Sequence, residues 1–499
     1  MSEEMPNTSK TGLAREMGLM GLAATGICSM IGAAINVVPV MIQRNVPGIG
    51  PDVLLSYLIA AVPAVLAALS YAILASAMPR AGGSYVYASR AVSPYAGFVA
   101  SFSQWFGLCM GIGVVSYVLP AFLRDIAEAL GWMAMAGLLN KDIVRLILPL
   151  LFLWTFVGVN LLGLKTYERT LVPLMFLMFI LGGVVIVTGF YFDHTDFSAA
   201  LLAKEGRSIP DLAETPLSMT TLLAGAAILF SSFIGFDSIA QAGGEAKNPN
   251  RTMPLAIGIS ILTVGSFYML FTAALYHAVP WAFIAEQAAT KDLTAPGLLG
   301  YLLSPGWTVA IVAGAAVGLI NDLPAMLLAV SRLMFAWAED GIFPRAFSRV
   351  HPTRHVPHIA IVASGGMASL GILGNHLAGD FFLGIDILVI SMLVNFLLMC
   401  ISVITLHHHN PEIAVEIRVF SSRKIHAPLA AIGVTVLGGF LAVHIWKDLT
   451  SAFTNWAHHS TYVWLIVMAI ATIVYVREVS KLKKNGVELK KLFLTLPPE

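Results

Sequence analysis

The main pattern along the chain is an alternation of long apolar runs with short polar connections. An apolar run of at least ~18 residues is long enough to cross the hydrocarbon core of a bilayer as a helix. The sequence contains twelve such runs, and no part of it resembles a separate soluble domain. The pattern therefore predicts an all-α polytopic membrane protein with helices at residues 17–43, 53–78, 92–122, 143–162, 169–192, 218–243, 253–279, 305–337, 357–375, 380–406, 427–446 and 460–477.

Lysine and arginine are unevenly divided between the two sides that these runs define. Cytosolic loops of membrane proteins carry an excess of both residues. With both termini in the cytosol, 21 of the 29 basic residues fall on the cytosolic side and eight on the outer side. We therefore expect a multi-pass protein of the plasma (cell inner) membrane with both termini cytosolic. The outer eight are Arg44, Arg124, Lys141, Arg145, Lys204, Arg207, Lys291 and Lys447.

Composition separates this chain from soluble and disordered proteins. Hydrophobic residues make up 58% of its 499 positions and charged residues 11%, against ~25% charged in an average soluble domain. A soluble enzyme is excluded because the chain lacks the charge to cover its surface. Disorder is excluded because it requires low hydrophobicity. The net charge of +1 implies no nucleic-acid partner.

Residues that usually bind metals do not form a metal-binding pattern. The three cysteines, Cys28, Cys109 and Cys400, lie in separate apolar runs, so neither a disulfide framework nor a metal site is expected from them. The three histidines at residues 407–409 follow the tenth run, and we interpret them as a solvated helix end. No metal and no cofactor are expected.

A short repeat relates the first apolar run to the sixth. Residues 29–32 and 232–235 both read Ser-x-Ile-Gly in the middle of a run. An odd number of crossings separates the copies, so they have opposite orientations, as in an inverted repeat. The predicted segments are a cytosolic N-terminal segment (1–16), a first five-helix repeat (17–192), a second, inverted five-helix repeat (218–406), two extra helices (427–477) and a basic cytosolic tail (478–499).

Glycine and small residues in the middle of these two runs allow each helix to break. A break exposes backbone groups that hydrocarbon cannot satisfy, so it persists only beside a cavity. The half-helix that follows presents a positive end to a carboxylate, and the released carbonyls suit an ammonium group. Two facing breaks therefore predict a midplane site for a zwitterion. The alternative is a set of close-packing contacts, as at Gly107, Gly111, Gly314 and Gly318.

Five groups of residues, spread over nearly the whole chain, form motifs with a fixed order and spacing. They are residues 26–35 (GICSMIGAAI), 79–87 (PRAGGSYVY), 160–165 (NLLGLK), 233–237 (FIGFD) with 245–254 (EAKNPNRTMP), and 331–332 (SR) with 340–344 (DGIFP). Together they resemble the amino acid–polyamine–organocation (APC) transporter superfamily. The resemblance implies a LeuT-like fold of five plus five inverted helices, with helices 1 and 6 broken and two further C-terminal helices.

The same resemblance implies roles for individual residues. The backbone amides expected to bind the substrate carboxylate are those of Gly32, Ala33 and Ala34. The carbonyls expected to bind the amino group are those of Met30, Ser231 and Ile234. The aromatic residues expected to form apolar walls or a gate are Phe233 and Phe236.

The chain departs from the family pattern in two places. Two alanines follow Gly32 where the family often has Gly-Ser-Gly or Gly-Thr-Gly, so a hydroxyl contact to the substrate is lost. Some proton-coupled members carry a lysine midway along helix 5. Here no lysine lies between Lys165 and Lys204, and Met175 and Met178 occupy that stretch. A lysine-based proton mechanism is therefore not expected.

Ionisable residues inside apolar runs are candidates for function because a charge in a bilayer is costly. Asp237 is expected either to act in gating or coupling or to make structural hydrogen bonds. Asn321 and Asp322, just before Pro324 in helix 8, are expected either to bind Na⁺ or a proton or to pair with freed backbone groups. Trp105 in helix 3 is a candidate pocket wall. The residues interpreted as interfacial or packing residues are Asp386, Asn395 and His444.

The sequence therefore predicts a secondary active transporter of α-amino acids that works by alternating access and is not an enzyme. Its expected partners are an amino acid substrate and the lipid bilayer. An amine or polyamine carrier and a non-transporting amino acid sensor stay open as alternatives. A channel and a membrane-embedded enzyme are disfavoured, because the sequence shows neither a polar filter run nor a nucleophile–base spacing. The substrate, the coupling to H⁺ or Na⁺ or by exchange, the direction of transport and the oligomeric state do not follow from the sequence.

Overall fold

The structure is a computed structural model that describes residues 15–32, 34–210, 212, 216, 218–379, 381–420, 422–451 and 456–497. Within these residues every assigned regular element is a helix, and twelve helical segments are long and apolar enough to cross a membrane. The all-α class and the twelve spans predicted from the sequence are therefore confirmed. The inverted repeat and the segment boundaries built on it stay predictions.

Several spans consist of more than one helix, because breaks or turns interrupt them. The first seven spans are α1 (Leu19–Ile31) with α2 (Ala34–Asn45), α3 (Val53–Ala77) preceded by η1 (Gly50–Asp52), α5 (Pro94–Tyr117) with α6 (Leu119–Ala129), α8 (Asp142–Leu161), α9 (Leu164–Tyr191), α11 (Met219–Leu229) with η2 (Phe230–Phe233) and α12 (Ser238–Gln241), and α13 (Pro249–Ala278). The other five are α16 (Pro305–Glu339), α17 (His358–Ala378), α18 (Phe382–His409), α20 (Arg423–Thr450) and α21 (Ser460–Lys484).

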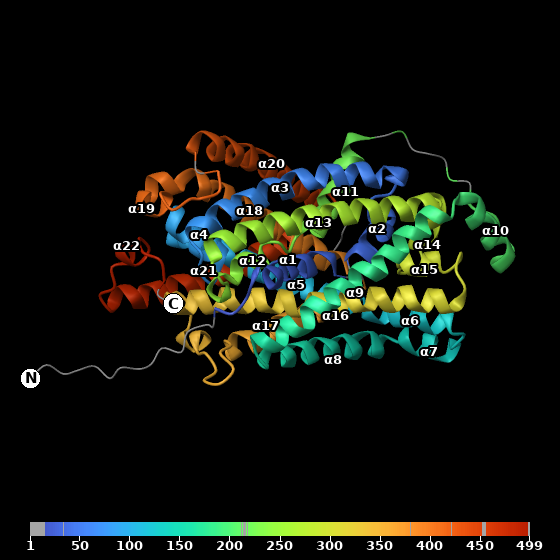
Figure 1. Ribbon diagram of the computed structural model, residues 1–499, viewed down its shortest axis with the longest axis horizontal. Coiled ribbons are helices and arrows are strands. Elements are labelled where there is room, and N and C mark those ends of the chain that lie inside the picture. The colour runs from blue at the N-terminus through green and yellow to red at the C-terminus, as the bar shows by residue number, and fades with distance from the viewer. Residues whose placement is uncertain are drawn as a thin grey trace, which may run out of the picture.

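Short helices cover the two ends of the bundle. In Figure 1 the spans run roughly along the longest axis, with α4 (Gly83–Ala91), α19 (Pro411–Ala414) and α22 (Leu489–Leu492) at one end. At the other end lie α7 (Met133–Leu139), α10 (His194–Glu205), α14 (Trp281–Ala288) and α15 (Ala295–Leu299) (Figure 1). The remaining short elements are η3 (Gly243–Glu245), η4 (Arg345–Ser348) and η5 (Trp456–His458).

We call the end with α4 and α22 the terminal end and the opposite one the far end. At the terminal end, Met17 pairs with Ala246, and Arg80 donates a hydrogen bond of 3.1 Å to the carbonyl of Pro497. Both ends of the described chain therefore lie at the same end of the bundle, as an even number of crossings requires. The assignment of this end to the cytosol stays a prediction.

Several connections between the predicted apolar runs contain short helices, and α10 and α4 are two examples. In the connection after the fifth span, Asp193 caps α10 by accepting hydrogen bonds from the amides of Thr195 and Asp196. Gly206, with φ +68°, ends that helix. Between the second and third spans, all nine residues of α4 are buried. A search for spans of membrane length misses both helices, because they are too short to cross a bilayer.

Small residues bring the central helices into close contact. A Cβ placed on Gly107 of α5 would lie 2.5 Å from the Cβ of Ser391 on α18, and one on Gly314 of α16 would lie 2.6 Å from the Cβ of Leu181 on α9. These two glycines therefore are close-packing contacts. The apolar window of the first span is fully buried by the surrounding helices, so α1 and α2 lie in the interior of the bundle.

Candidate functional site

The first span is interrupted at Gly32. α1 ends at Ile31 and α2 begins at Ala34. Gly32 has φ 9° and ψ −138°, which lies outside the helical region. Of the three residues expected to bind a carboxylate, Ala33 lies outside the described residues, and for Ala34 the structure describes only the backbone. The chain thus leaves the helix at the position where the sequence predicts a break.

The sixth span is interrupted between Leu229 and Ser238, with one 3₁₀ turn, η2, in the interval. Gly235 has φ +140°, a conformation that other residues rarely adopt. A Cβ on Gly235 would also collide with the carbonyl oxygen of Ser29. The hydroxyls of Ser29 and Ser238 lie 3.1 Å apart, so a hydrogen bond joins the two broken spans. The two breaks are therefore in direct contact.

Hydrogen bonds satisfy some of the backbone groups that the breaks release. The Tyr268 hydroxyl on α13 donates to the carbonyl of Met30 at 2.9 Å. The Ile234 amide donates to the carbonyl of Ser231 at 3.2 Å. The Ser231 hydroxyl is buried and has no hydrogen-bond partner among the described residues. The site therefore retains a hydroxyl that a ligand can use.

A small cavity lies between the two breaks. Its volume is about 60 Å³, which is room for a few water molecules. Asp322 is the one charged side chain among the described residues that line it. Most of the wall is apolar and comes from Val37 and Val38 on α2, Val114 and Val115 on α5, and Ile385 and Leu388 on α18.

The structure brings several of the predicted residues together on this cavity, namely Met30, Ser231, Ile234 and Asp322. Asp322 lies against the first break, because a Cβ on Gly32 would collide with its carboxylate. Asn321 is turned to α1 and α9 instead. Its side-chain amide donates to the sulfur of Cys28 at 2.9 Å and to the carbonyl of Leu171 at 3.3 Å.

Three predicted aromatic residues are not among the residues that line this cavity. Phe233 meets Tyr57 edge-on, with ring centroids 6.3 Å apart. Phe236 stacks on Phe396 of α18 at 5.1 Å. Trp105 donates its indole N–H to a serine hydroxyl of α17 at 3.1 Å. In the described conformation all three side chains pack between helices.

Asp237 is fully buried, and both of its carboxylate oxygens accept hydrogen bonds. One accepts from the amide of Gly235 at 3.0 Å, and the other accepts from the side-chain amide of Gln104 on α5. The Gln104 oxygen accepts in turn from Ser84 on α4 and from Gln241 at 3.0 Å. This chain of hydrogen bonds ties the second break to α4 and α5. Of the two alternatives that the sequence allows for Asp237, these hydrogen bonds correspond to the structural one; the other is a role in gating or coupling.

The terminal end is closed by a buried ion pair and by close backbone contacts. Arg332 on α16 binds Glu245 of η3, and neither side chain is more than 2% exposed. The Met17 amide donates to the carbonyl of Glu245 at 2.9 Å, which holds the start of the first span against η3. A Cβ on Gly83 would lie 2.7 Å from the backbone of Ala240, so α4 is packed directly onto α12.

A wider space opens from the cavity toward the far end. It has a volume of about 610 Å³ and shares Val37, Val118 and Phe381 with the cavity. Three apolar side chains therefore stand between the cavity and the wider space. The described conformation is thus closed toward the terminal end and more open toward the far end.

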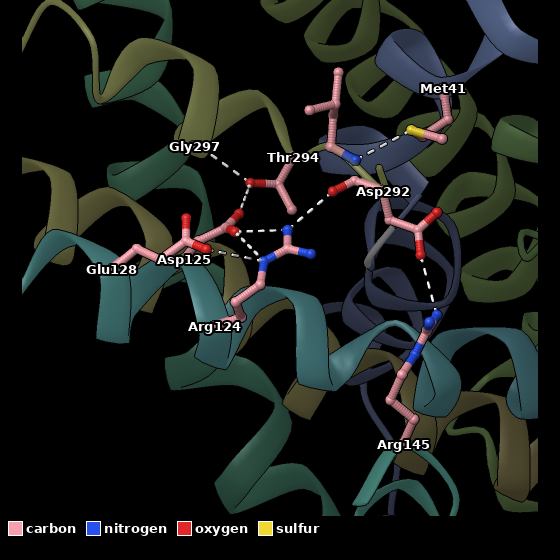
Figure 2. Close-up of polar contacts among 9 residues, drawn as sticks. Met41, Arg124, Asp125, Glu128, Arg145, Asp292, Thr294 and Gly297 are labelled. Carbon is pink, nitrogen blue, oxygen red and sulfur yellow. Dashed lines mark hydrogen bonds and ion pairs between the residues drawn. The ribbon is translucent and has the colours of Figure 1, made fainter. Parts of the chain in front are cut away.

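Charged residues frame this wider space (Figure 2). Asp292, in the connection between α14 and α15, binds Arg44 of α2 at 3.1 Å and Arg145 of α8 at 3.2 Å. Its carbonyl accepts a hydrogen bond of 2.9 Å from Arg124 of α6. Figure 2 shows Arg124 and Arg145 converging on Asp292 from separate helices. One loop residue thereby ties together α2, α6 and α8.

Two interactions at the site were not predicted from the sequence. Tyr268 lies inside the seventh apolar run, and no neighbouring residue marks its hydrogen bond to Met30. Arg332 and Glu245 both belong to the family motifs, but their ion pair joins residues that are 87 positions apart. The sequence shows one negative charge just after the sixth apolar run and one positive charge inside the eighth. Only the folded structure shows that the two side chains pair.

Comparison with known proteins identifies the family. The family model described as amino acid permease matches residues 17–476. The chain belongs to this family. The permease is thereby a member of the APC superfamily, as its motifs indicate.

Relatives of the permease carry the names of amino acid transporters. The branched-chain amino acid permease BcaP of Bacillus subtilis (strain 168) is 26% identical over 490 residues, which cover 95% of each chain. Cationic amino acid transporter 4 of Mus musculus is 28% identical over 376 residues, 73% of this chain and 56% of the relative. The chloroplastic cationic amino acid transporter 9 of Arabidopsis thaliana is 29% identical over 363 residues, 70% of this chain and 59% of the relative. The permease thus spans just over half the length of these two cationic relatives.

Proposed function

We propose that this permease is a secondary active transporter of α-amino acids that works by alternating access around the cavity between its broken spans. The observation that carries the proposal is the direct contact of two interrupted helices beside a cavity in the interior of the bundle. Released backbone groups are stable in a membrane only where they line such a cavity. Membership of the amino acid permease family supports the same function.

The proposed recognition of the substrate main chain uses both breaks. α2 begins at the first break, so its positive N-terminal end is suited to the carboxylate, through the amides of Gly32, Ala33 and Ala34. The carbonyls of Met30, Ser231 and Ile234 are proposed to receive the amino group. The Ser231 hydroxyl, unpartnered within the described chain, takes the place of the hydroxyl that the first break lacks.

The wall of the cavity favours a neutral amino acid with an aliphatic side chain. It is built largely of valine, isoleucine and leucine side chains, which stabilise apolar groups by excluding water. A lysine or arginine substrate would bring a second positive charge, and Asp322 is the one charged residue on the described wall. The printed name of the relative BcaP, a branched-chain amino acid permease, agrees with this choice.

The closed terminal end and the wider far end support alternating access. For release at the terminal end, the Arg332–Glu245 pair has to separate, and α12 has to move away from α4. For closure at the far end, the side chains around Phe381 have to seal the cavity. Phe233 and Phe236 stand on or beside the second break, and we propose that they act as gates when it moves. With the predicted orientation, the described conformation faces outward from the plasma membrane.

Reconstitution in proteoliposomes tests this proposal. Uptake of labelled leucine, arginine and putrescine is measured against liposomes without protein and against Gly235→Ala, which removes the conformational freedom of the second break. We expect leucine flux in the native permease and no flux in the variant. Flux of putrescine without amino acid flux would indicate an amine carrier, and leucine binding without flux would indicate a sensor. The absence of flux for every amino acid would overturn the proposal.

A further inference from the structure

The chain after α21 folds back onto the terminal end, where α22 lies (Figure 1). We call residues 489–497 the strap; they comprise α22 and the residues that follow it. Three leucines of the strap pack, partly buried, against the core of the bundle, namely Leu489, Leu492 and Leu496. Phe493 is 5% exposed. The strap is therefore bound to the bundle through its apolar side chains.

Side chains from three places in the bundle also bind the backbone of the strap. The donors are the side-chain amide of Asn410 at 2.8 Å and the guanidinium groups of Arg90 at 3.2 Å and Arg80 at 3.1 Å, and the acceptors are, in the same order, the carbonyls of Leu494, Thr495 and Pro497. Asn410 follows α18, Arg90 belongs to α4, and Arg80 lies in the link between α3 and α4. The strap therefore fastens this link to α4.

Phe493 is the main side-chain anchor of the strap. The guanidinium group of Arg90 lies 4.9 Å from the centroid of the Phe493 ring. Such a cation–π contact is most favourable where water is excluded, and Arg90 is 3% exposed. Arg90 also forms an ion pair of 2.6 Å with Asp340, which follows α16. Loss of the Phe493 ring would therefore weaken the strap without leaving Arg90 unpaired.

The link that the strap fastens lies directly on the end of the second broken span. A Cβ on Gly243 of η3 would lie 2.6 Å from the carbonyl oxygen of Arg80. Ala81 pairs with Ala242, just after α12, in an isolated bridge. Arg80 thus contacts η3 through its carbonyl group and the strap through its side chain.

The helix before the link is joined to the same broken span. The hydroxyls of Tyr57 on α3 and Ser232 on η2 lie 3.2 Å apart. Tyr71 on α3 meets Phe236 edge-on, with ring centroids 5.7 Å apart. We therefore expect α3 and the link to move with the second break, whereas the Arg90–Asp340 pair holds α4 against α16.

We propose that the strap regulates the permease by holding the terminal end closed, and that it separates from the link or from α4 when this end opens. The inference rests on the proposed function, in which α12 moves away from α4 to release the substrate. The strap binds the link through Arg80 and α4 through Arg90, so it bridges the two parts that this motion separates. Its binding energy therefore opposes opening.

Maleimide labelling of the purified full chain, in a background without the three native cysteines, tests the proposal. Ala242→Cys reports on the terminal end, and Val118→Cys, between the cavity and the wider space, reports on the far end. With Phe493→Ala added, we expect labelling at position 242 to be about tenfold faster, because the anchor of the closed conformation is lost. Labelling at position 118 should become slower, because alternating access closes one end as the other opens. An unchanged rate at position 242, or faster labelling at both positions, would overturn the inference.

Leu494→Ala is the matched control, because this neighbouring side chain of the strap is 44% exposed. It should label at the native rates. A variant without residues 488–499, which keeps α21, should shift both rates as Phe493→Ala does, and native rates in this variant would also overturn the inference. Leucine flux in proteoliposomes is measured separately. Its absence in the native permease would overturn the proposed function, whereas flux with unchanged labelling would overturn the role of the strap alone.

Discussion

At the residue scale, two glycines and two aspartates determine the geometry of the site. Position 235 requires glycine because its φ is positive and because the Ser29 carbonyl leaves no room for a Cβ. Position 32 requires glycine because the Asp322 carboxylate lies against it and leaves no room for a Cβ. Asp237 holds the second break by accepting a hydrogen bond from the Gly235 amide. Each break is therefore paired with one carboxylate. The absence of a Cβ makes room for the Asp322 carboxylate at Gly32 and for the Ser29 carbonyl at Gly235.

Gly32→Ala is expected to abolish leucine transport in a folded protein. The added methyl group would overlap the Asp322 carboxylate and displace it or the start of α2. Overpacking of this kind costs ~1–3 kcal/mol, so leucine binding measured by thermal shift should weaken by about tenfold or more. Gly258→Ala on α13 is the control, because an added Cβ there meets nothing within 4 Å. Native-like binding by the Gly32 variant would show that the first break is not part of the site.

Asp237→Asn is expected to lower the melting temperature of the purified permease. The new amide oxygen can still accept from Gly235, but the new NH₂ group would face the NH₂ group of Gln104, whose oxygen is already bound to Ser84 and Gln241. A buried group left without its partner costs ~1–3 kcal/mol.

In the double variant Asp237→Asn with Gln104→Glu, the amide NH₂ at position 237 can donate to the carboxylate at position 104. The double variant should therefore recover the melting temperature. The pH dependence of leucine uptake should keep its shape in both proteins. A changed pH profile in Asp237→Asn with an unchanged melting temperature would assign coupling to Asp237 instead.

At the element scale, the short segments around the breaks are held by different contacts at the two ends. Toward the terminal end, η3 is fixed to α16 by the buried Arg332–Glu245 pair and to the first span by the Met17 backbone. Toward the far end, α2 is tied through Arg44 to Asp292, which is about one quarter exposed. A buried ion pair resists the loss of one partner more strongly than an exposed one, so the described conformation is held mainly at the terminal end.

Glu245→Gln is expected to open the terminal end. It leaves the Arg332 charge buried without a carboxylate, which costs ~3–5 kcal/mol. In a background without the three native cysteines, Ala242→Cys, which is fully buried here, should react faster with a maleimide once Glu245 is replaced. Glu478→Gln is the control, because its partner Lys481 is 53% exposed. An unchanged labelling rate would show that this ion pair does not hold the end closed.

At the scale of the whole molecule, the twelve spans differ widely in burial. The apolar window of the first span is 100% buried, whereas those of α20 and α21 are 22% and 17% buried. The lipid bilayer must cover the side chains that these outer helices expose, because large apolar surfaces are unfavourable in water. The site thus lies within helices that contact other helices, and the last two spans contribute mainly to the lipid-facing surface.

Labelling of intact cells tests the predicted orientation. Leu202 on α10 is 61% exposed at the far end, and Val415 beside α19 is 83% exposed at the terminal end. A membrane-impermeant maleimide should label Leu202→Cys in intact cells and Val415→Cys only after permeabilisation, because the terminal end is predicted to be cytosolic. The opposite pattern would reverse the orientation.

The sequence by itself determined the number of spans and the places where two of them can break. Each span must supply its own run of about 20 apolar residues, and each break needs small residues at one position, so both signals are local. The apolar pattern did not predict the short helices α4 and α10, because neither contains an apolar run of membrane-spanning length.

Only the tertiary structure decided which side chains meet at the site. The contact of Asp322 with Gly32, the hydrogen bond from Tyr268 to Met30 and the pairing of Arg332 with Glu245 each join distant parts of the chain. In a bilayer nearly every face of a helix is apolar, so the pattern of apolar residues does not specify how each helix is rotated against its neighbours. That rotation, fixed by the packing of small residues between helices, directs each polar side chain to its partner.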